Sequence, residues 1–235
     1  MESMAGPLQR LIFFKILKKV NNHNTDPMDR SLGRDKIEAN DPFCLIFTSG
    51  TTGLPKAAPY THQAALKSCT MKMMVGMKPG EVGYSALPLY HTFASQVGVT
   101  GAIIAGAAVA FAPKFSASKF WSDCIKYDAQ YIHYIGEMMR YLVEAPPSDL
   151  DKAHRVKCAI GSGLRYDIWP RLKPRFGDMW YFEIYGSTEG NLQFANIMDD
   201  ESCICRLTPF MKTALSAEIV KFDPIEEQVI RNEKG

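Results

Sequence analysis

The chain has 235 residues, 46% of them hydrophobic and 22% charged, a composition typical of a globular protein with ample material for a core. The net charge of +2 gives no whole-chain argument for nucleic-acid binding, so we predict no nucleic-acid partner. No stretch reaches the roughly 20 apolar residues of a membrane-spanning helix. We also expect no signal peptide, because the apolar run at residues 11–14 is too short for one.

Six cysteines are spread along the chain. The only close pair, Cys203 and Cys205, lacks the second pair of ligands that a zinc site needs. We therefore predict reduced thiols that serve mainly as packing residues, as in intracellular proteins.

The first predicted element is a helix between Leu8 and Val20 (LQRLIFFKILKKV) with an apolar stripe and a basic edge. Such a helix can lie on an anionic membrane surface. The alternative is a helix that packs on the domain and leaves its basic edge in water. Residues 21–41 are polar and are predicted to form a linker or surface loop.

A strand–helix alternation begins at Pro42. The apolar run at residues 43–47 predicts a short strand inside a parallel sheet. Thr61 is well suited to cap a helix over His62–Met74, which Gly76 and Pro79 would end.

Between these two elements lies a loop that alternates hydroxyls with glycines and ends in a lysine. Gly50 and Gly53 allow backbone N–H groups to face a phosphate, and hydroxyl donors and a positive charge surround them. The other members of this loop are Thr48, Ser49, Thr51, Thr52 and Lys56. The spacing does not match Walker A. The alternative is an exposed turn with an unrelated lysine, but the flanking strand and the Pro-Lys pair favour a phosphate-binding loop.

The alternation continues to residue 184. Apolar and β-branched runs predict strands over residues 84–87, 107–112, 131–135, 156–160 and 180–184. Periodic stretches predict helices over residues 95–105, 120–127, 137–143 and 167–176, with Ser116 or Ser118 as a cap and Pro170 in a first turn. Two later runs, 217–222 and 228–231, predict a β-hairpin.

Repeated strand–loop–helix units predict an α/β fold, doubly wound around a mainly parallel sheet. In such sheets ligands bind beyond the carboxyl ends of the strands. Four polar segments follow predicted strands here, at residues 48–56, 88–92, 161–165 and 185–189. We expect them to meet at one edge of the sheet.

These segments resemble the adenylate-forming enzymes, which include acyl-CoA synthetases, luciferases and the adenylation domains of peptide synthetases. TSGTTGLPK at residues 48–56 is similar to their phosphate-binding signature, and YGSTE at 185–189 to their second signature. LPLYH at 87–91, KFSASKFW at 114–121, YIGE at 134–137 and GSGLR at 161–165 resemble the fatty acid transport protein branch, the very long-chain acyl-CoA synthetases or solute carrier family 27. The resemblance runs from about residue 42 to the end of the sequence.

The resemblance implies a two-step reaction, in which a fatty carboxylate attacks the α-phosphate of ATP to give acyl-AMP and coenzyme A then takes the acyl group. The loop from Thr48 to Lys56, with Ser49, Gly50, Thr51, Thr52 and Gly53 between them, would hold the β- and γ-phosphates. Glu189 and Thr51 would bind Mg²⁺. Thr188 would bind the α-phosphate, and His91 would lie near the reacting carboxylate.

The adenine site is implied in the same way. Tyr185 would stack on the adenine ring, with Gly186 next to it in the second signature. Gly161, Ser162 and Gly163 would let the backbone approach the ring. Taken singly, each of these residues has a simpler interpretation as a cap, a turn or a packing residue, so the assignment rests on their joint occurrence.

Some parts of the family pattern are not in the sequence. The ribose-binding aspartate, the hinge and the small lid with its catalytic lysine would lie beyond Gly235, and most of the N-terminal subdomain with its membrane-spanning start is also missing. We therefore expect residues 42–200 to be the central AMP-binding core, 1–41 to be a helix and linker, and 201–235 to begin a β subdomain. The chain would be a truncated acyl-CoA synthetase, intracellular and associated with the endoplasmic reticulum or plasma membrane. The alternative is a non-catalytic nucleotide-binding or regulatory paralogue. The sequence leaves open whether the chain forms a homo-oligomer.

Overall fold

The computed structural model of the chain describes residues 36–48, 54–188, 190, 193–201, 203–205 and 207–231. Residues 39–235 belong to one structural unit. The helix predicted between Leu8 and Val20 and most of the predicted linker lie outside the described residues.

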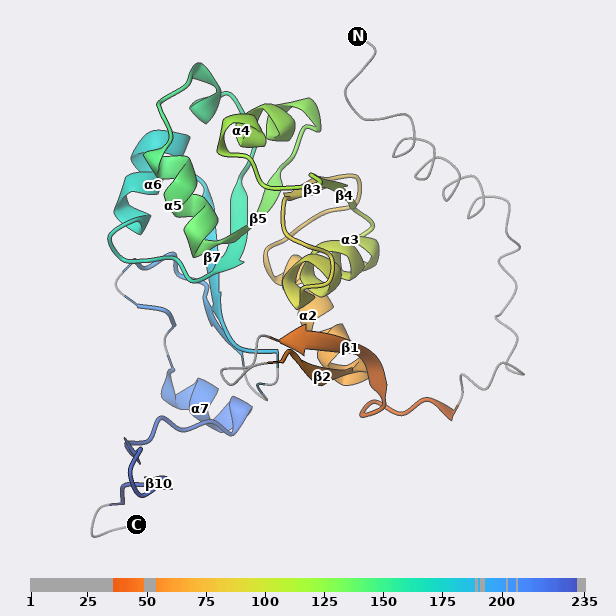
Figure 1. Cartoon of the computed structure of the whole chain (residues 1–235), viewed down its shortest axis with the longest axis vertical. Helices are drawn as coiled ribbons and strands as arrows, with labels where there is room; N and C mark the ends of the chain where they lie inside the picture. Colours follow the sequence, from red (N-terminus) through yellow and green to blue (C-terminus); the bar gives the residue numbers. More distant parts are fainter. Residues whose placement is uncertain are drawn as a thin grey trace. The chain divides into compact units, whose positions relative to one another are not determined.

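A six-stranded sheet forms the centre of this unit (Figure 1). Its strand order is β4-β3-β5-β6-β7-β8, in which all neighbours from β4 to β7 are parallel and only β8 is antiparallel. The strands are β3 (Val82–Ser85), β4 (Ala108–Phe111), β5 (Tyr131–Ile135), β6 (Cys158–Ser162), β7 (Trp180–Tyr185) and β8 (Phe194–Asn196). This confirms the predicted mainly parallel α/β fold.

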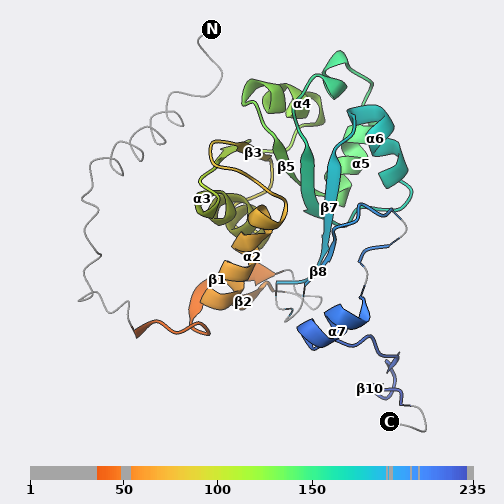
Figure 2. The same ribbon diagram turned by 180° about the vertical axis from the view of Figure 1, so that it is seen from behind.

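Helices cover both faces of the sheet (Figures 1 and 2). One face carries α4 (Ala117–Lys126), α5 (Gly136–Glu144) and α6 (Trp169–Phe176), and the other carries α2 (His62–Met74), η3 (Phe93–Thr100) and α3 (Gly101–Ile104). Side chains of a strand point alternately to the two faces. In β5, Ile132 therefore packs into the core under α4 to α6, whereas Tyr131 packs into the core under α2 and η3.

The strand order contains a reversal next to β3. After β3 the chain passes through η3 and α3 to β4 on one side, and then returns through α4 to β5 on the other side of β3. Connections that leave in opposite directions open a crevice at the carboxyl ends of the strands, and ligands of open α/β sheets bind there. The turn that follows β3, which includes His91, lies at this reversal.

The strand predicted at residues 43–47 forms, but its predicted place in the parallel sheet is wrong. It is β1 (Pro42–Thr48), which pairs antiparallel with β2 (Lys56–Thr61) in a separate two-stranded sheet. Only Ile46 of its apolar residues is buried, whereas Phe43, Leu45 and Phe47 are exposed. Two strand segments joined by a short loop close into a hairpin more readily than they cross to a parallel neighbour.

Most other predicted elements are confirmed, with shifted ends. Thr61 caps α2, and its Oγ1 accepts a hydrogen bond from the Ala64 N–H at 3.2 Å. Pro170 lies in the first turn of α6, and Ser116 is the N-cap of α4 without a side-chain capping bond. The predicted helix at 95–105 is a π-helix, η3, that continues into α3, and Gly106 follows it with φ +64°.

The C-terminal hairpin is shorter than predicted. It consists of β9 (Phe222–Asp223) and β10 (Gln228–Val229), and residues 217–221 are not in a strand. Four short elements were not predicted: β2, β8, the 3-10 helix η4 (Asp149–Lys152) and the helix α7 (Pro209–Leu215). Within the part of the chain that the structure describes, no helix has the length and apolar character needed to cross a bilayer.

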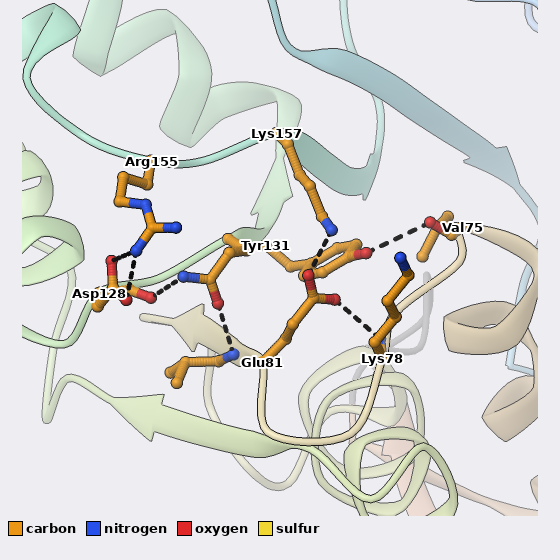
Figure 3. Close-up of polar contacts among 9 residues, drawn as sticks. Val75, Lys78, Glu81, Asp128, Tyr131, Arg155 and Lys157 are labelled. Carbon is orange, nitrogen blue, oxygen red and sulfur yellow. Dashed lines mark hydrogen bonds and ion pairs between the residues drawn. The ribbon is translucent and has the colours of Figure 1, made fainter.

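Ion pairs and hydrogen bonds fix the amino ends of β3, β5 and β6 (Figure 3). Lys157, just before β6, contacts Glu81, just before β3, and Glu81 also accepts the Lys78 N–H at 2.8 Å. Arg155 donates to both carboxylate oxygens of Asp128 at 3.1 and 2.9 Å. These contacts join the strand ends far from the loops at the carboxyl edge, so they are a structural brace and not part of the candidate site.

Candidate functional site

A cavity of about 320 Å³ lies at the carboxyl edge of the sheet. It brings together residues from the hairpin, from α2, from the turn after β3, and from the ends of β6 and β7. The lining residues are Thr48, Tyr60, Ser68, Met71, His91, Thr92, Phe93, Val97, Ser162, Ile184, Gly186, Ser187, Thr188 and Gln193. Its polar lining consists of hydroxyl groups, one imidazole and one amide, with no carboxylate, and four large apolar side chains complete it: Met71, Phe93, Val97 and Ile184. This set of donors suits an anionic group such as a phosphate.

The hairpin contributes Thr48, the first residue of the predicted phosphate loop. Thr48 and Lys56 pair across the hairpin, and Thr48 Oγ1 donates to the Lys56 carbonyl at 3.4 Å. Lys56 itself is exposed and is not among the lining residues. Ser49, Gly50, Thr51, Thr52 and Gly53 lie outside the described residues, so the phosphate contacts predicted for the loop stay predictions.

His91 lies in the turn between β3 and η3. Its Nδ1 accepts the Phe93 N–H at 3.2 Å, and its carbonyl accepts both the N–H and the hydroxyl of Ser95. Partial desolvation lowers the pKa of the imidazole. The ring is therefore neutral at pH 7, and because Nδ1 accepts, Nε2 carries the proton. His91 offers one N–H donor to the cavity without adding a positive charge.

Of residues 161–163, predicted to contact adenine, only Ser162, the last residue of β6, lines the cavity. A Cβ on Gly161 would lie 2.5 Å from the ring of Tyr134, so this glycine is required by packing against a buried aromatic side chain. Gly163 has φ +80°, and its carbonyl oxygen would be only 1.6 Å from a Cβ on Gly136. The two backbones at the ends of β5 and β6 therefore touch. The adenine contacts predicted for Gly161 and Gly163 stay predictions.

Glu183, in the middle of β7, positions this segment and was not identified from the sequence. Its side chain is 3% exposed, and it accepts the Leu164 N–H at 2.9 Å and the Tyr134 hydroxyl at 2.5 Å. Burial raises the pKa of the Glu183 carboxyl, although these bonds to its charged form oppose the shift. The sequence signal that could have identified Glu183 is a carboxylate within the otherwise apolar strand WYFEIY.

Replacing Glu183 with alanine is expected to lower the free energy of unfolding by about 2–4 kcal/mol. The buried Tyr134 hydroxyl and the partly buried Leu164 N–H would lose their acceptor, and leaving a buried donor unsatisfied costs about 1–3 kcal/mol. Urea denaturation at pH 7.5 measures this change. Glu137→Ala is the control, because Glu137 pairs with Arg140 on the surface and should contribute little. Equal stability of the two variants would contradict the role of Glu183.

The second signature follows β7 directly. Gly186, Ser187 and Thr188 line the cavity, whereas Tyr185 is 59% exposed and is not among the lining residues. Glu189 lies outside the described residues. Within the described ranges, no three His, Cys, Asp or Glu side chains lie close enough together to hold a metal ion. The predicted Mg²⁺ ligands, Thr51 and Glu189, are both in undescribed positions.

A second cavity of about 670 Å³ adjoins the first. The two share Tyr60, Met71, Ile184, Ser187, Thr188 and Gln193. Beyond these shared residues, the second cavity has several large apolar side chains, which are Met74, Phe182 and Phe194. The site therefore has one part next to His91 and a second part between α2 and β8, and both mix polar with apolar side chains.

The sequence matches the family model described as "AMP-binding enzyme" over residues 11–235. The long-chain fatty acid transport protein 2 of Rattus norvegicus is 40% identical over 220 residues, which cover 94% of this chain and 35% of that protein. The long-chain fatty acid transport protein 3 of Mus musculus is 43% identical over 195 residues, which cover 83% of this chain and 29% of that protein. The chain thus spans about a third of the length of these relatives.

Solved structures of adenylate-forming enzymes share the fold. The ATP-bound structure of MatB from Rhodopseudomonas palustris has a TM-score of 0.60 at 27% identity, covering 69% of this chain and 32% of that one. A malonyl-CoA ligase in a ternary product complex with methylmalonyl-CoA and AMP has a TM-score of 0.61 at 23% identity, and the match covers 75% of this chain and 42% of that one.

Proposed function

Because the chain belongs to the family of AMP-binding enzymes, we propose that it carries the central part of a fatty acid–CoA ligase, which activates a long-chain fatty acid with ATP. The overall reaction forms acyl-AMP and pyrophosphate, and coenzyme A then accepts the acyl group. The observation that carries the proposal is the cavity at the carboxyl edge. It gathers Thr48, His91 and Thr188 from three separate predicted signatures.

In this proposal the residues act by position and hydrogen bonding. The charge that develops on phosphate oxygens during adenylation is stabilised by fixed donors more than by covalent chemistry. Thr188 would donate to the α-phosphate, and His91 would donate from Nε2 to the reacting carboxylate or to the α-phosphate. Lys56 and the loop 49–53 would hold the β- and γ-phosphates, with Mg²⁺ bound by Thr51 and Glu189.

The two cavities suggest how the substrates divide the space. The hydroxyls and the imidazole of the cavity next to His91 suit the phosphates and the carboxylate. The adjoining cavity, with Met74, Phe182 and Phe194, suits the alkyl chain. Adenine would lie against Tyr185 and residues 161–163. Association with an intracellular membrane is part of the same proposal, by analogy with fatty acid transport proteins.

The first test is binding and turnover by the 235-residue chain. We expect saturable binding of ATP with Mg²⁺ by calorimetry, and release of pyrophosphate when a long-chain fatty acid is added. Binding without pyrophosphate release would support the alternative, a nucleotide-binding paralogue that does not catalyse. Absence of saturable binding would contradict both functions.

Replacing Ser162 with phenylalanine is expected to weaken ATP binding at least ~10-fold, because the ring would take up space in the 320 Å³ cavity that the ligand needs. Calorimetric titration with ATP and Mg²⁺ measures the effect. Thr70→Phe is the matched control, since Thr70 is exposed on α2 and lines neither cavity. Unchanged affinity of the Ser162 variant would place the nucleotide elsewhere.

A further inference from the structure

A lysine and a histidine are buried together behind the cavity wall. Lys72 on α2 and His133 on β5 are each 0% exposed, and Lys72 Nζ lies 2.5 Å from His133 Nε2. No carboxylate in the described part of the chain forms an ion pair with Lys72. A buried ammonium without a counter-ion is costly, so the neutral amine is favoured.

The pair packs directly against η3. A Cβ on Gly98 would lie 3.5 Å from His133 Cε1, and a Cβ on Gly101 would lie 2.7 Å from Lys72 Cγ. The ring of Phe93 makes an edge contact with the His133 ring at 6.2 Å. Phe93 and Val97 of the same π-helix line the candidate site. One turn of π-helix therefore separates the basic pair from the ligand cavity.

Among the described residues, one further charge lies near the pair: the Lys157 ammonium, 5.0 Å from the Tyr131 ring and paired with Glu81. The other titratable groups near the pair are the Tyr131 ring on β5, 5.7 Å from Lys72 Nζ, and the Cys158 thiol on β6. Burial raises the pKa of each to about 12, so both are neutral near pH 7. The sequences of η3, α3 and β4 contain no titratable side chain. His133 Nδ1 has no hydrogen-bond partner among the described residues.

We propose that the Lys72–His133 pair is a pH-sensitive support for η3, whose protonation loosens the π-helix and weakens ligand binding at the cavity. When both groups are neutral, the amine donates to Nε2 and the pair fills the space behind η3. An added proton places a charge there with no carboxylate to receive it. π-helical turns are rare and often occur at functional sites, and η3 carries Phe93 and Val97 of the cavity wall, so a change in its support reaches that wall.

The direction of the pH effect follows from burial. Desolvation lowers the pKa of Lys72 from 10.5 to about 7. The pKa of His133 lies well below 6.5, mainly because the ring is buried and also because Lys72 is close. Between pH 7 and 10.5 the unfolded lysine carries a proton that the folded one lacks, so stability rises with pH. Below pH 7 the folded lysine is protonated as well, and the charge is then present behind η3.

The stability test compares wild type with Lys72→Met and with Lys119→Met, an exposed lysine on α4. From pH 7.5 to 9.5 the unfolding equilibrium constant of wild type should fall more steeply than that of Lys72→Met. The difference should reach up to ~10-fold per pH unit, which is the effect of one linked proton. Lys119→Met should follow wild type. Identical slopes for all three proteins would overturn the proposal.

The binding test rests on the proposed function, whereas the stability test does not. The affinity for ATP with Mg²⁺ should fall ~3–10-fold more between pH 8 and 6 in wild type than in Lys72→Met. If wild type and Lys72→Met have equal pH profiles of ATP affinity but different stability slopes, the buried pair titrates without affecting the site, and the proposed effect on binding is refuted. If Lys72→Met fails to fold, NMR titration of the wild-type lysine Cε signals decides, and a Lys72 signal that titrates near 10.5 refutes the proposal.

Discussion

Replacing Gly136 with alanine is expected to lower the free energy of unfolding by about 3 kcal/mol or more. The new Cβ would lie 1.6 Å from the Gly163 carbonyl oxygen and 2.3 Å from its carbon. Both are backbone atoms, so no side chain can rotate away and the segment after β6 must move. Extra atoms in a well-packed core usually destabilise a protein by about 1–3 kcal/mol, and we expect the upper end of that range here. Urea denaturation measures the loss.

The matched control is Gly83→Ala, a buried strand glycine in the same sheet. Its Cβ would meet its nearest atoms at 3.5 Å, which is ordinary contact. Gly83→Ala should therefore stay within about 1 kcal/mol of wild type. Because the segment that must move follows Ser162, the last residue of β6 and a lining residue of the cavity, Gly136→Ala should also weaken ATP binding. A Gly136 variant as stable as the control would mean that the backbones at the ends of β5 and β6 do not touch.

The main features of the fold could be predicted from local patterns. The run YIHYI predicts β5 because β-branched and aromatic residues favour strands, and the same argument holds for β7. Thr61 predicts the start of α2 because a threonine hydroxyl satisfies a free N–H of the first turn. These signals involve neighbours in sequence, so no tertiary contact is needed to recognise them.

The error at β1 has an equally local cause. An uninterrupted apolar run is typical of a strand buried on both faces, yet Leu45 and Phe47 are exposed on a hairpin. Apolar character alone does not separate a central strand from a hairpin strand. The partner strand, KAAPYT, was not predicted, because Pro59 and two alanines disfavour a strand.

Parts of the site depend on contacts between distant residues. Glu183 meets Tyr134 across 49 positions, and Lys72 meets His133 across 61, so spacing in the sequence carries no sign of either pair. The convergence of Thr48, His91, Ser162 and Thr188 was expected from strand ends. It occurs, although Thr48 arrives from the hairpin and not from the parallel sheet.

Replacing His91 with alanine is expected to lower the rate of pyrophosphate release ~100-fold or more while nucleotide binding changes less than ~3-fold. Loss of one preorganised donor to a developing charge costs 10²–10³ in rate. The donor here is Nε2–H of a neutral imidazole, since Nδ1 accepts from the Phe93 N–H. The measurements are pyrophosphate release with ATP and a long-chain fatty acid, and calorimetric titration with ATP and Mg²⁺.

Tyr90→Ala is the control for His91. Tyr90 precedes it in the same turn, is 79% exposed and does not line the cavity, so the variant should retain the wild-type rate. A readout that needs no turnover is the affinity for a stable acyl-adenylate mimic, which should fall ~10-fold in His91→Ala alone because the lost donor faces the joined carboxyl and phosphate groups. If His91→Ala keeps both the rate and this affinity, His91 serves only to close the turn onto Phe93 and Ser95, and the carboxylate is bound by other residues.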